Sequence, residues 1–140
     1  MKILMAVDDS AVAAKVIRRV AKLAKELKDA PQVVVLHVVP RLSRAAEKEF
    51  GKAGPGRYYN GQSEAVLGLV RPLLRRTGLS FVERKAVGDI APTILAEAAA
   101  AKADMIAIGS HGKGALKSLL IGSVAQKVIA TSPVPVLAVR

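Results

Sequence analysis

The sequence I-G-S-H-G-K-G-A-L-K-S-L-L-I-G-S-V occupies residues 108–124 and decides how the rest of the chain is interpreted. The apolar run Met105–Ile108, which leads into it, is typical of a buried strand. A helical pattern follows at residues 124–130. The glycines of this segment are Gly109, Gly112, Gly114 and Gly122. The pattern therefore predicts a strand, a glycine-containing loop and a helix.

This loop has features of an anion-binding site. Glycines after a strand allow the backbone to approach a ligand closely and to adopt positive φ angles. The backbone N–H groups of such a loop, and of the helix after it, form a favourable site for phosphate. No acidic residue follows Asp104, whereas Lys113, Lys117, Lys127 and Arg140 do. We therefore expect this segment to bind an anion.

The glycine spacing differs from those of two common phosphate-binding loops. Gly109 and Gly114 have the separation found in a Walker loop, but Ala115 stands where that loop has its lysine. The G-x-G within the segment also lacks the third glycine of a dinucleotide-binding fingerprint. The spacing present is Gly109-x2-Gly112-x9-Gly122-Ser123. This pattern closely resembles the ATP-binding motif of the universal stress protein family.

The composition predicts a single folded domain, residues 1–140. The chain has 51% hydrophobic and 24% charged residues, which places it outside the disordered class and suffices for a substantial core. It has no cysteine, which excludes disulfides and thiolate metal sites. The N-terminal segment MKILMAVDD is too short for a signal-peptide core, and no apolar run approaches the length of a membrane span. We therefore expect a cytoplasmic protein with no membrane partner.

The charge of the chain is strongly positive. Lys and Arg total 22 against 11 Asp and Glu, giving a net charge of +11, which is compatible with nucleic-acid binding. However, the chain has only 2 Tyr, 2 Phe and no Trp, too few for an aromatic platform on which bases stack. The basic residues are also dispersed over the predicted helices. We expect a solvated basic surface and a small-anion site rather than a nucleic-acid partner.

Apolar runs and helical patterns alternate along the chain. Continuous apolar runs predict strands that are buried on both faces of a parallel sheet, and apolar residues at helical spacing predict helices. The predicted strands are Lys2–Val7, Val33–Val39, Phe81–Val87, Met105–Ile108 and Pro135–Val139. The predicted helices are Ala11–Leu27, Ser43–Phe50, Ser63–Arg76, Ile90–Ala101 and Ser123–Ala130. Between them, Gly51–Gly61 is predicted to be a mobile surface loop with Tyr58 and Tyr59 at its exposed tip.

This alternation predicts an α/β fold, a single doubly wound sheet of five parallel strands in the order 3-2-1-4-5 with helices on both faces. The third strand contains Glu83, Arg84 and Lys85 and is therefore expected at an edge. In such sheets, ligands bind beyond the carboxyl ends of the strands, where the strand order reverses. The first and fourth strands meet at that point, so we expect Asp8 and Gly109 to converge.

The resemblance to the universal stress protein family covers nearly the whole chain. Ile3–Ser10 resembles the first strand and acidic turn of that family, and Leu36–Val38 its second strand. Asp104–Gly109 and Ser132–Arg140 are similar to its fourth and closing strands, while residues 40–76 carry no recognisable motif. The resemblance implies an ATP-binding protein with Mg²⁺ as the counter-ion of the nucleotide.

The resemblance also implies which residues bind the nucleotide. Adenine would lie near Val38, with the end of the first strand close by, while the loop after the fourth strand would surround the ribose and phosphates. The implied residues are Ala6, Val7, Asp8, Val38, Ile108, Gly109, Ser110, His111, Gly112, Lys113, Gly114, Gly122, Ser123, Val124 and Ala125. Family members pair through the fifth strand, so we expect a homodimer formed by Val136–Val139.

Three polar residues near these strand ends also suit structural roles. Ser123-x-x-Gln126 is a capping-box pattern, so Ser123 can cap a helix or bind phosphate. Asp8 can likewise cap a helix or contact the ribose or a metal ion. Asp9 occupies a position where the family commonly has glycine. Its carboxylate either repels phosphates unless Mg²⁺ intervenes or caps the next helix and faces solvent, which is the interpretation that we favour.

The two histidines are assigned different roles. His37 lies in a predicted buried strand and is interpreted as a hydrogen-bonded core residue rather than a ligand-binding one. His111 lies in the polar loop, where we expect it near phosphate but not as a catalytic base, because no carboxylate partner is evident beside it. Two distant histidines without cysteine predict no metal site.

The resemblance implies a stress-response protein, and the residue inventory favours a nucleotide-dependent regulator with at most slow ATP hydrolysis. Groups that hold phosphates are abundant, but no base is evidently positioned to activate water. Two alternatives remain open. One is an enzyme that splits adenine nucleotides on the same fold, and the other is a polyanion-binding module that uses the basic surface.

Overall fold

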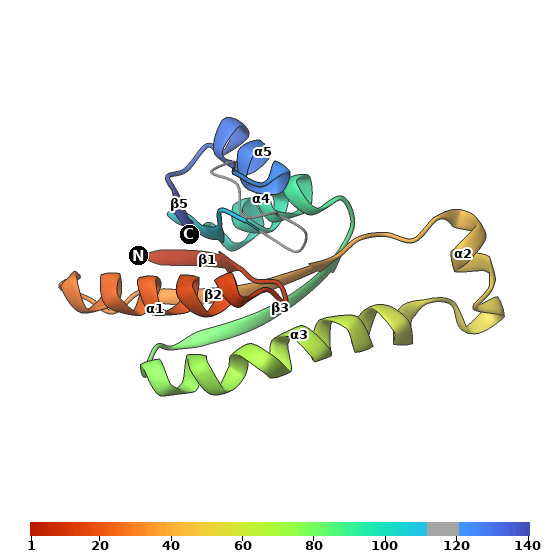
Figure 1. Cartoon of the computed structure of the whole chain (residues 1–140), viewed down its shortest axis with the longest axis horizontal. Coiled ribbons are helices and arrows are strands. Elements are labelled where there is room, and N and C mark those ends of the chain that lie inside the picture. Colours follow the sequence, from red (N-terminus) through yellow and green to blue (C-terminus); the bar gives the residue numbers. More distant parts are fainter. Residues whose placement is uncertain (112–120) are drawn as a thin grey trace.

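The computed structural model describes residues 1–111 and 121–140. These residues form a five-stranded parallel sheet with helices on both faces (Figure 1). The strands are β1 (Lys2–Ala6), β2 (Gln32–Val39), β3 (Phe81–Val87), β4 (Met105–Gly109) and β5 (Val136–Val139). Their order across the sheet is β3-β2-β1-β4-β5. The predicted fold class and strand order are confirmed.

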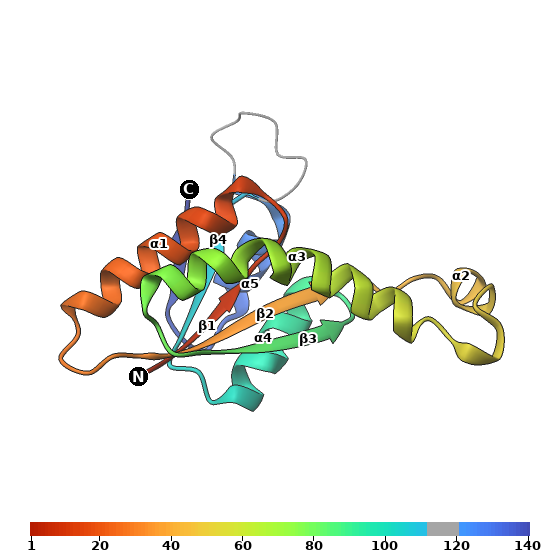
Figure 2. The ribbon, with the colours of Figure 1, turned by 90° about the horizontal axis from the view of Figure 1, so that it is seen from below.

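The helices divide between the two faces of the sheet. Helices α1 and α3 lie side by side over one face, and α4 and α5 cover the other (Figure 2). Their bounds are α1 (Ala11–Glu26), α2 (Arg44–Lys48), α3 (Gly56–Thr77), α4 (Ile90–Ala101) and α5 (Ser123–Thr131), with a short 3₁₀ helix η1 (Gly51–Ala53). Within residues 1–111 and 121–140, no helix is long and apolar enough to span a membrane.

The two helical layers explain why the strands are apolar on both faces. Successive side chains of a strand point to opposite faces. Ile3 and Val33, which pair in register, belong to the core beneath α1 and α3. Leu4 and Val34, the next pair, belong to the core beneath α4 and α5. Burial on both faces therefore requires continuous rather than alternating apolar runs.

Strand β3 lies at the edge of the sheet, as its polar residues predicted. Arg71 of α3 donates from Nε to Glu83 Oε1 of β3 at 2.7 Å and from Nη2 to Glu64 Oε2 at 2.8 Å. Lys85 of β3 also forms an ion pair with Glu64. The polar side chains of this edge strand therefore attach it to α3.

The prediction of a loop at Gly51–Gly61 is wrong, because η1 and the first turns of α3 occupy this range. Aromatic packing favours these helices. The rings of Phe50 and Tyr58 lie 5.7 Å apart, and those of Tyr58 and Tyr59 lie 5.5 Å apart. Tyr59 is not at an exposed tip, since its hydroxyl donates to Glu47 Oε1 at 2.7 Å and accepts from the backbone of Leu42 at 3.0 Å.

Residues 40–61 form an arm that projects beyond the sheet (Figures 1 and 2). The arm comprises α2, η1 and the first turns of α3, and neither α2 nor η1 contains a buried residue. Gly54, with φ 68°, makes the turn that leads into α3. The cavity described below lies at the carboxyl ends of β1, β2 and β4.

Candidate functional site

A cavity of about 550 Å³ lies at the carboxyl ends of β1, β2 and β4. Its volume is within the range of about 300–1,000 Å³ found for small-molecule sites. Strands β1 and β4 are neighbours where the strand order reverses. Asp8, just after β1, and Gly109, at the end of β4, both line the cavity. The structure thus brings together the two positions that the predicted topology placed side by side.

The predicted nucleotide-binding residues that the structure describes all line this cavity. They are Ala6, Val7, Asp8, Val38, Ile108, Gly109, Ser110, His111, Gly122, Ser123, Val124 and Ala125. Gly112, Lys113 and Gly114 lie outside the described residues. Whether these positions contact a ligand stays a prediction, but their common location is a structural fact.

The cavity is also lined by residues that the sequence analysis did not assign to the site. They are Asp9, Ala13, Leu36, His37, Pro40, Ile90 and Ile94. Most of them are apolar, and from the sequence they could equally be assigned to the core. Only their place in the chain could have assigned them to the site, because each lies near the end of a strand or in the first turns of a helix.

One wall of the cavity is apolar. Leu36 and Val38 of β2, Ile94 of α4 and Ile108 of β4 are buried and belong to the same core cluster. They come from three elements that meet at the end of the sheet. Such a wall can pack against a flat, largely apolar group such as a nucleobase.

The N-terminus of α5 forms another part of the cavity lining. Gly122 is its N-cap residue, with φ −62° and ψ 151°, and no side chain within residues 1–111 and 121–140 caps the helix by a hydrogen bond. The capping-box alternative for Ser123 is therefore wrong, because Ser123 lies one position inside the helix. The first N–H groups of a helix have no intrahelical acceptor. Gly122 and Ser123 thus bring the positive end of the α5 dipole to the cavity.

Ser110 joins the surrounding strands to this helix. Its backbone N–H donates to the carbonyl of Val139 in β5 at 2.7 Å, and its carbonyl accepts from Gly122 N at 2.7 Å. The residue is buried, with 2% of its surface exposed. These two bonds fix the end of β4 against β5 and against the start of α5.

His111 has one satisfied and one unsatisfied nitrogen among the described residues. Its Nδ1 lies 2.9 Å from Ser110 Oγ. Its Nε2 is buried and has no hydrogen-bond partner within residues 1–111 and 121–140. Buried polar atoms are usually paired, so this nitrogen is an exception among the described residues.

The acidic turn after β1 is organised by Asp8. Its Oδ1 accepts hydrogen bonds from the backbone N–H of Ser10 at 3.0 Å and from Ser10 Oγ at 2.5 Å. Ser10 is the N-cap residue of α1, so the prediction that Asp9 caps this helix is wrong. Asp9 is exposed at the cavity lining. The site therefore carries two adjacent carboxylates on one side and the positive end of α5 on another.

Gly109 is required by packing. A Cβ atom at this position would lie 2.9 Å from Val12 Cγ1 of α1 and 3.3 Å from the backbone oxygen of His111. Among the described glycines, those with positive φ are Gly51, Gly54 and Gly78, so the expectation of a positive φ does not hold at Gly109. The close approach of α1 to β4 accounts for this glycine.

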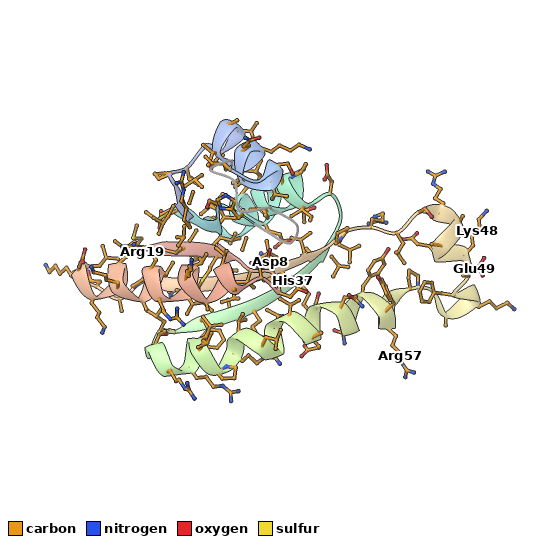
Figure 3. All side chains as sticks on the ribbon, in the orientation of Figure 1. Asp8, Arg19, His37, Lys48, Glu49 and Arg57 are labelled. Carbon is orange, nitrogen blue, oxygen red and sulfur yellow. The ribbon has the colours of Figure 1, made fainter. Side chains whose placement is uncertain are left out.

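His37 is the hydrogen-bonded core histidine that was predicted, and it also lines the cavity. It is 9% exposed, and its Nδ1 lies 3.3 Å from Ser63 Oγ of α3. Burial lowers the pKa of His37, while the carboxylates of Asp8 and Asp9 oppose this effect and raise it in part. Figure 3 shows Asp8 and His37 at the same end of the sheet. At neutral pH the imidazole is therefore neutral.

This pKa predicts a contribution of His37 to acid sensitivity. Because the pKa in the folded state lies below the ordinary value of about 6.5, the unfolded chain binds a proton first as the pH falls. The stability that comes from a neutral His37 is present above about pH 6.5 and is lost below it. We expect urea unfolding to show a smaller loss of stability between pH 7.5 and 5 in His37→Gln than in the wild type. Parallel pH profiles of the two proteins would contradict this.

Comparisons with known proteins identify the class to which this fold and cavity belong. A model of the universal stress protein family matches residues 1–140. The chain is 29% identical over 140 residues to universal stress protein MJ0531 of Methanocaldococcus jannaschii, covering 99% of this chain and 81% of that protein. A stretch of 53 residues is 51% identical to a universal stress protein of Thermus aquaticus and spans 38% of this chain and 39% of that protein. The chain belongs to the universal stress protein family.

Solved structures agree with this assignment. The structure of protein MJ0577 has a TM-score of 0.80 and 29% identity, covering 99% of this chain and 94% of that one. A universal stress protein from Archaeoglobus fulgidus, solved in complex with dAMP, has a TM-score of 0.72 and 24% identity, with coverage of 100% and 98%. A further universal stress protein, solved in complex with cAMP, has a TM-score of 0.71 and 21% identity, with coverage of 100% and 97%. The last two likenesses show a shared fold.

Proposed function

We propose that this universal stress protein binds ATP in the cavity and acts as a nucleotide-dependent regulator in the cytoplasm. The observation that carries the proposal is the combination, in one cavity, of an apolar wall and a helix N-terminus that no side chain of the described residues caps. Val38 and Ile108 stand on the apolar side, and Gly122 and Ser123 stand at the start of α5. A nucleotide has the matching pair of parts, a flat base and a chain of anionic phosphates.

The solved complexes of other family members support the choice of an adenine nucleotide. The Archaeoglobus fulgidus protein was solved with dAMP and another family member with cAMP. Both ligands contain adenine and a phosphate group. His111 adds a polar side chain to the lining of the cavity.

Mg²⁺ is proposed as a counter-ion carried by the nucleotide. In the described part of the chain, no group of three or more His, Cys, Asp or Glu residues could hold a metal ion by itself. Asp8 and Asp9 nevertheless place two carboxylates at the cavity. These carboxylates would disfavour bare triphosphate, whereas a magnesium ion between them and the phosphates would offset the repulsion.

We further propose that two copies pair through β5. This strand lies at one edge of the sheet and pairs with β4 along its inner side. Val136 and Leu137 are only partly buried. An apolar edge strand with unpaired backbone groups is stabilised by a second copy. Because Ser110 is bonded to Val139, the cavity and this edge are in direct contact, and nucleotide binding can alter the dimer.

Isothermal titration calorimetry with ATP·Mg²⁺ tests the proposed function. We expect saturable binding by the wild type and no binding by Ala6→Phe, whose ring would occupy the cavity beside Val38. Ala45→Phe, on the exposed surface of α2, is the matched control and should bind like the wild type. GTP should bind more weakly than ATP. A folded wild-type protein that does not bind ATP would overturn the proposal.

A further inference from the structure

His37 has a polar atom that its place in the core does not use. The residue follows Leu36 at the end of β2, and its ring lies between the sheet and α3. Nδ1 is occupied by Ser63, at 3.3 Å. Nε2 has no hydrogen bond to any described residue, and it is not among the buried atoms that lack a partner. An atom of this kind is accessible, and the space that His37 lines is the cavity.

Ser63 holds the imidazole in this orientation. The serine is 1% exposed and lies in α3 next to the apolar core residues Val66 and Leu67. A polar pair costs stability in such surroundings unless its atoms are bonded to each other. The bond from α3 to Nδ1 satisfies Ser63 and fixes the ring, which leaves Nε2 as the free end of a preorganised pair.

The location of His37 selects the part of the ligand that it can reach. His37 precedes Val38 in β2, but successive side chains point to opposite faces, so the His37 ring lies on the face of α1 and α3, close enough to Asp8 and Asp9 for their carboxylates to act on it. The phosphate-binding groups proposed above lie on α5, which packs on α4 across the other side of the sheet. Nε2 is therefore placed to meet the nucleoside rather than the phosphates.

We propose that His37 is a specificity-determining residue of the cavity, whose Nε2 hydrogen-bonds to the nucleoside part of the ligand, and that Ser63 is its positioning residue. This inference rests on the proposed binding of an adenine nucleotide. The neutral imidazole can donate or accept through Nε2, depending on which nitrogen carries its proton. It can therefore recognise a ribose hydroxyl on this side of the cavity, while the base packs against the apolar wall on the other face.

Two substitutions of His37 separate the roles of its nitrogens. Asparagine keeps a polar atom near the position of Nδ1, where Ser63 can bond to it, but has none at the position of Nε2. Glutamine reaches the position of Nε2. We expect His37→Asn to weaken ATP and AMP by the same factor, about three- to tenfold, as one lost hydrogen bond requires. His37→Gln should remain within about twofold of the wild type.

Nuclear magnetic resonance provides a readout that does not depend on affinity. The chain has 2 histidines, so the imidazole signals of His37 are assigned by their absence from His37→Asn. ATP titration of the wild type should shift the Nε2 signal of His37. In Ser63→Ala the ring loses its fixed orientation, and we expect an intermediate loss of affinity.

The outcomes distinguish the inference from the proposed function. If ATP binds saturably but His37→Asn binds equally well and the His37 signals do not move, His37 has no role in recognition and the proposed function stands. If no adenine nucleotide binds to the folded wild type, the proposed function fails and this inference fails with it. If His37→Asn does not fold, His37→Gln assigns the imidazole signals instead, and their shift in the wild type and the affinity of Ser63→Ala decide.

Discussion

Replacing Gly109 with alanine is expected to lower the free energy of unfolding by about 1–3 kcal/mol, although it adds a single methyl group. The added Cβ would lie 2.9 Å from Val12 Cγ1 and 3.3 Å from the backbone oxygen of His111. The first neighbour belongs to α1 and the second to the chain that leaves β4. Since the site is enclosed from both sides, the Val12 side chain, α1 or the end of the sheet has to move. Urea unfolding measures the loss.

A second substitution tests the cause of this loss. Val12→Ala removes Cγ1 and should restore part of the stability when combined with Gly109→Ala, so the effects of the two substitutions should not be additive. Gly68→Ala is the matched control, because a Cβ there meets no atom within 4 Å and Gly68 lies inside α3. We expect it to raise stability by about 0.5–1 kcal/mol. Additive effects of Val12→Ala and Gly109→Ala would show that contact with α1 is not the reason for the glycine.

Ser123→Pro is expected to weaken ATP binding about tenfold or more relative to Ser123→Ala. Ser123 is the first residue of α5, a position where proline fits the helix but supplies no N–H. Gly122 has φ −62° and ψ 151°, which is a conformation that a residue before proline readily adopts. Both variants lack the serine hydroxyl, so their difference isolates one backbone donor. A charge-assisted bond to phosphate contributes about 1.5–3 kcal/mol.

Calorimetry with a series of ligands checks this prediction. The ratio of affinities between Ser123→Ala and Ser123→Pro should be large for ATP and close to one for adenosine, which has no phosphate. Thermal unfolding of the two variants without ligand should coincide to within a few degrees, because the replaced N–H is not part of the helix ladder. Equal affinity of the two variants for ATP would place the phosphates away from the start of α5.

The fold could be predicted because its signal is distributed over many residues. Strands β1, β2 and β4 are continuous apolar runs, and a parallel sheet covered on both faces is the arrangement that buries them. The polar residues of β3 placed that strand at the edge. The location of the cavity followed from the topology, since the strand order fixes where Asp8 and Gly109 meet.

The parts that were not predicted depend on a few specific contacts. Helix α3 begins at Gly56 because Phe50, Tyr58 and Tyr59 pack together, which local glycine content does not reveal. The reason for Gly109 is a neighbour distant in sequence, Val12.

Side-chain direction accounts for the remaining differences. His37 reads as a core residue from its apolar neighbours in the strand, and only its bond to Ser63 of α3 leaves Nε2 accessible. Ser123 fits a capping-box pattern, but the helix begins one residue earlier than this pattern requires. The periodicity of apolar residues identifies helices and strands. A binding site, in contrast, depends on which polar atoms those helices and strands leave without a hydrogen bond.

The strand order has a consequence for the synthesis of this protein. Strand β1 leaves the ribosome first and pairs with β2 and β4, as Ile3 does with Val33 and Met105. At about 5–20 residues per second, several seconds pass between the emergence of these two partners. During that interval β1, β2 and β3 can assemble with α1 and α3. The side chains of Leu4, Val34 and Leu36 stay uncovered until α4 has been synthesised. The nascent chain therefore presents an apolar sheet face to chaperones before its cavity exists, because α5 and β4 complete the cavity walls last.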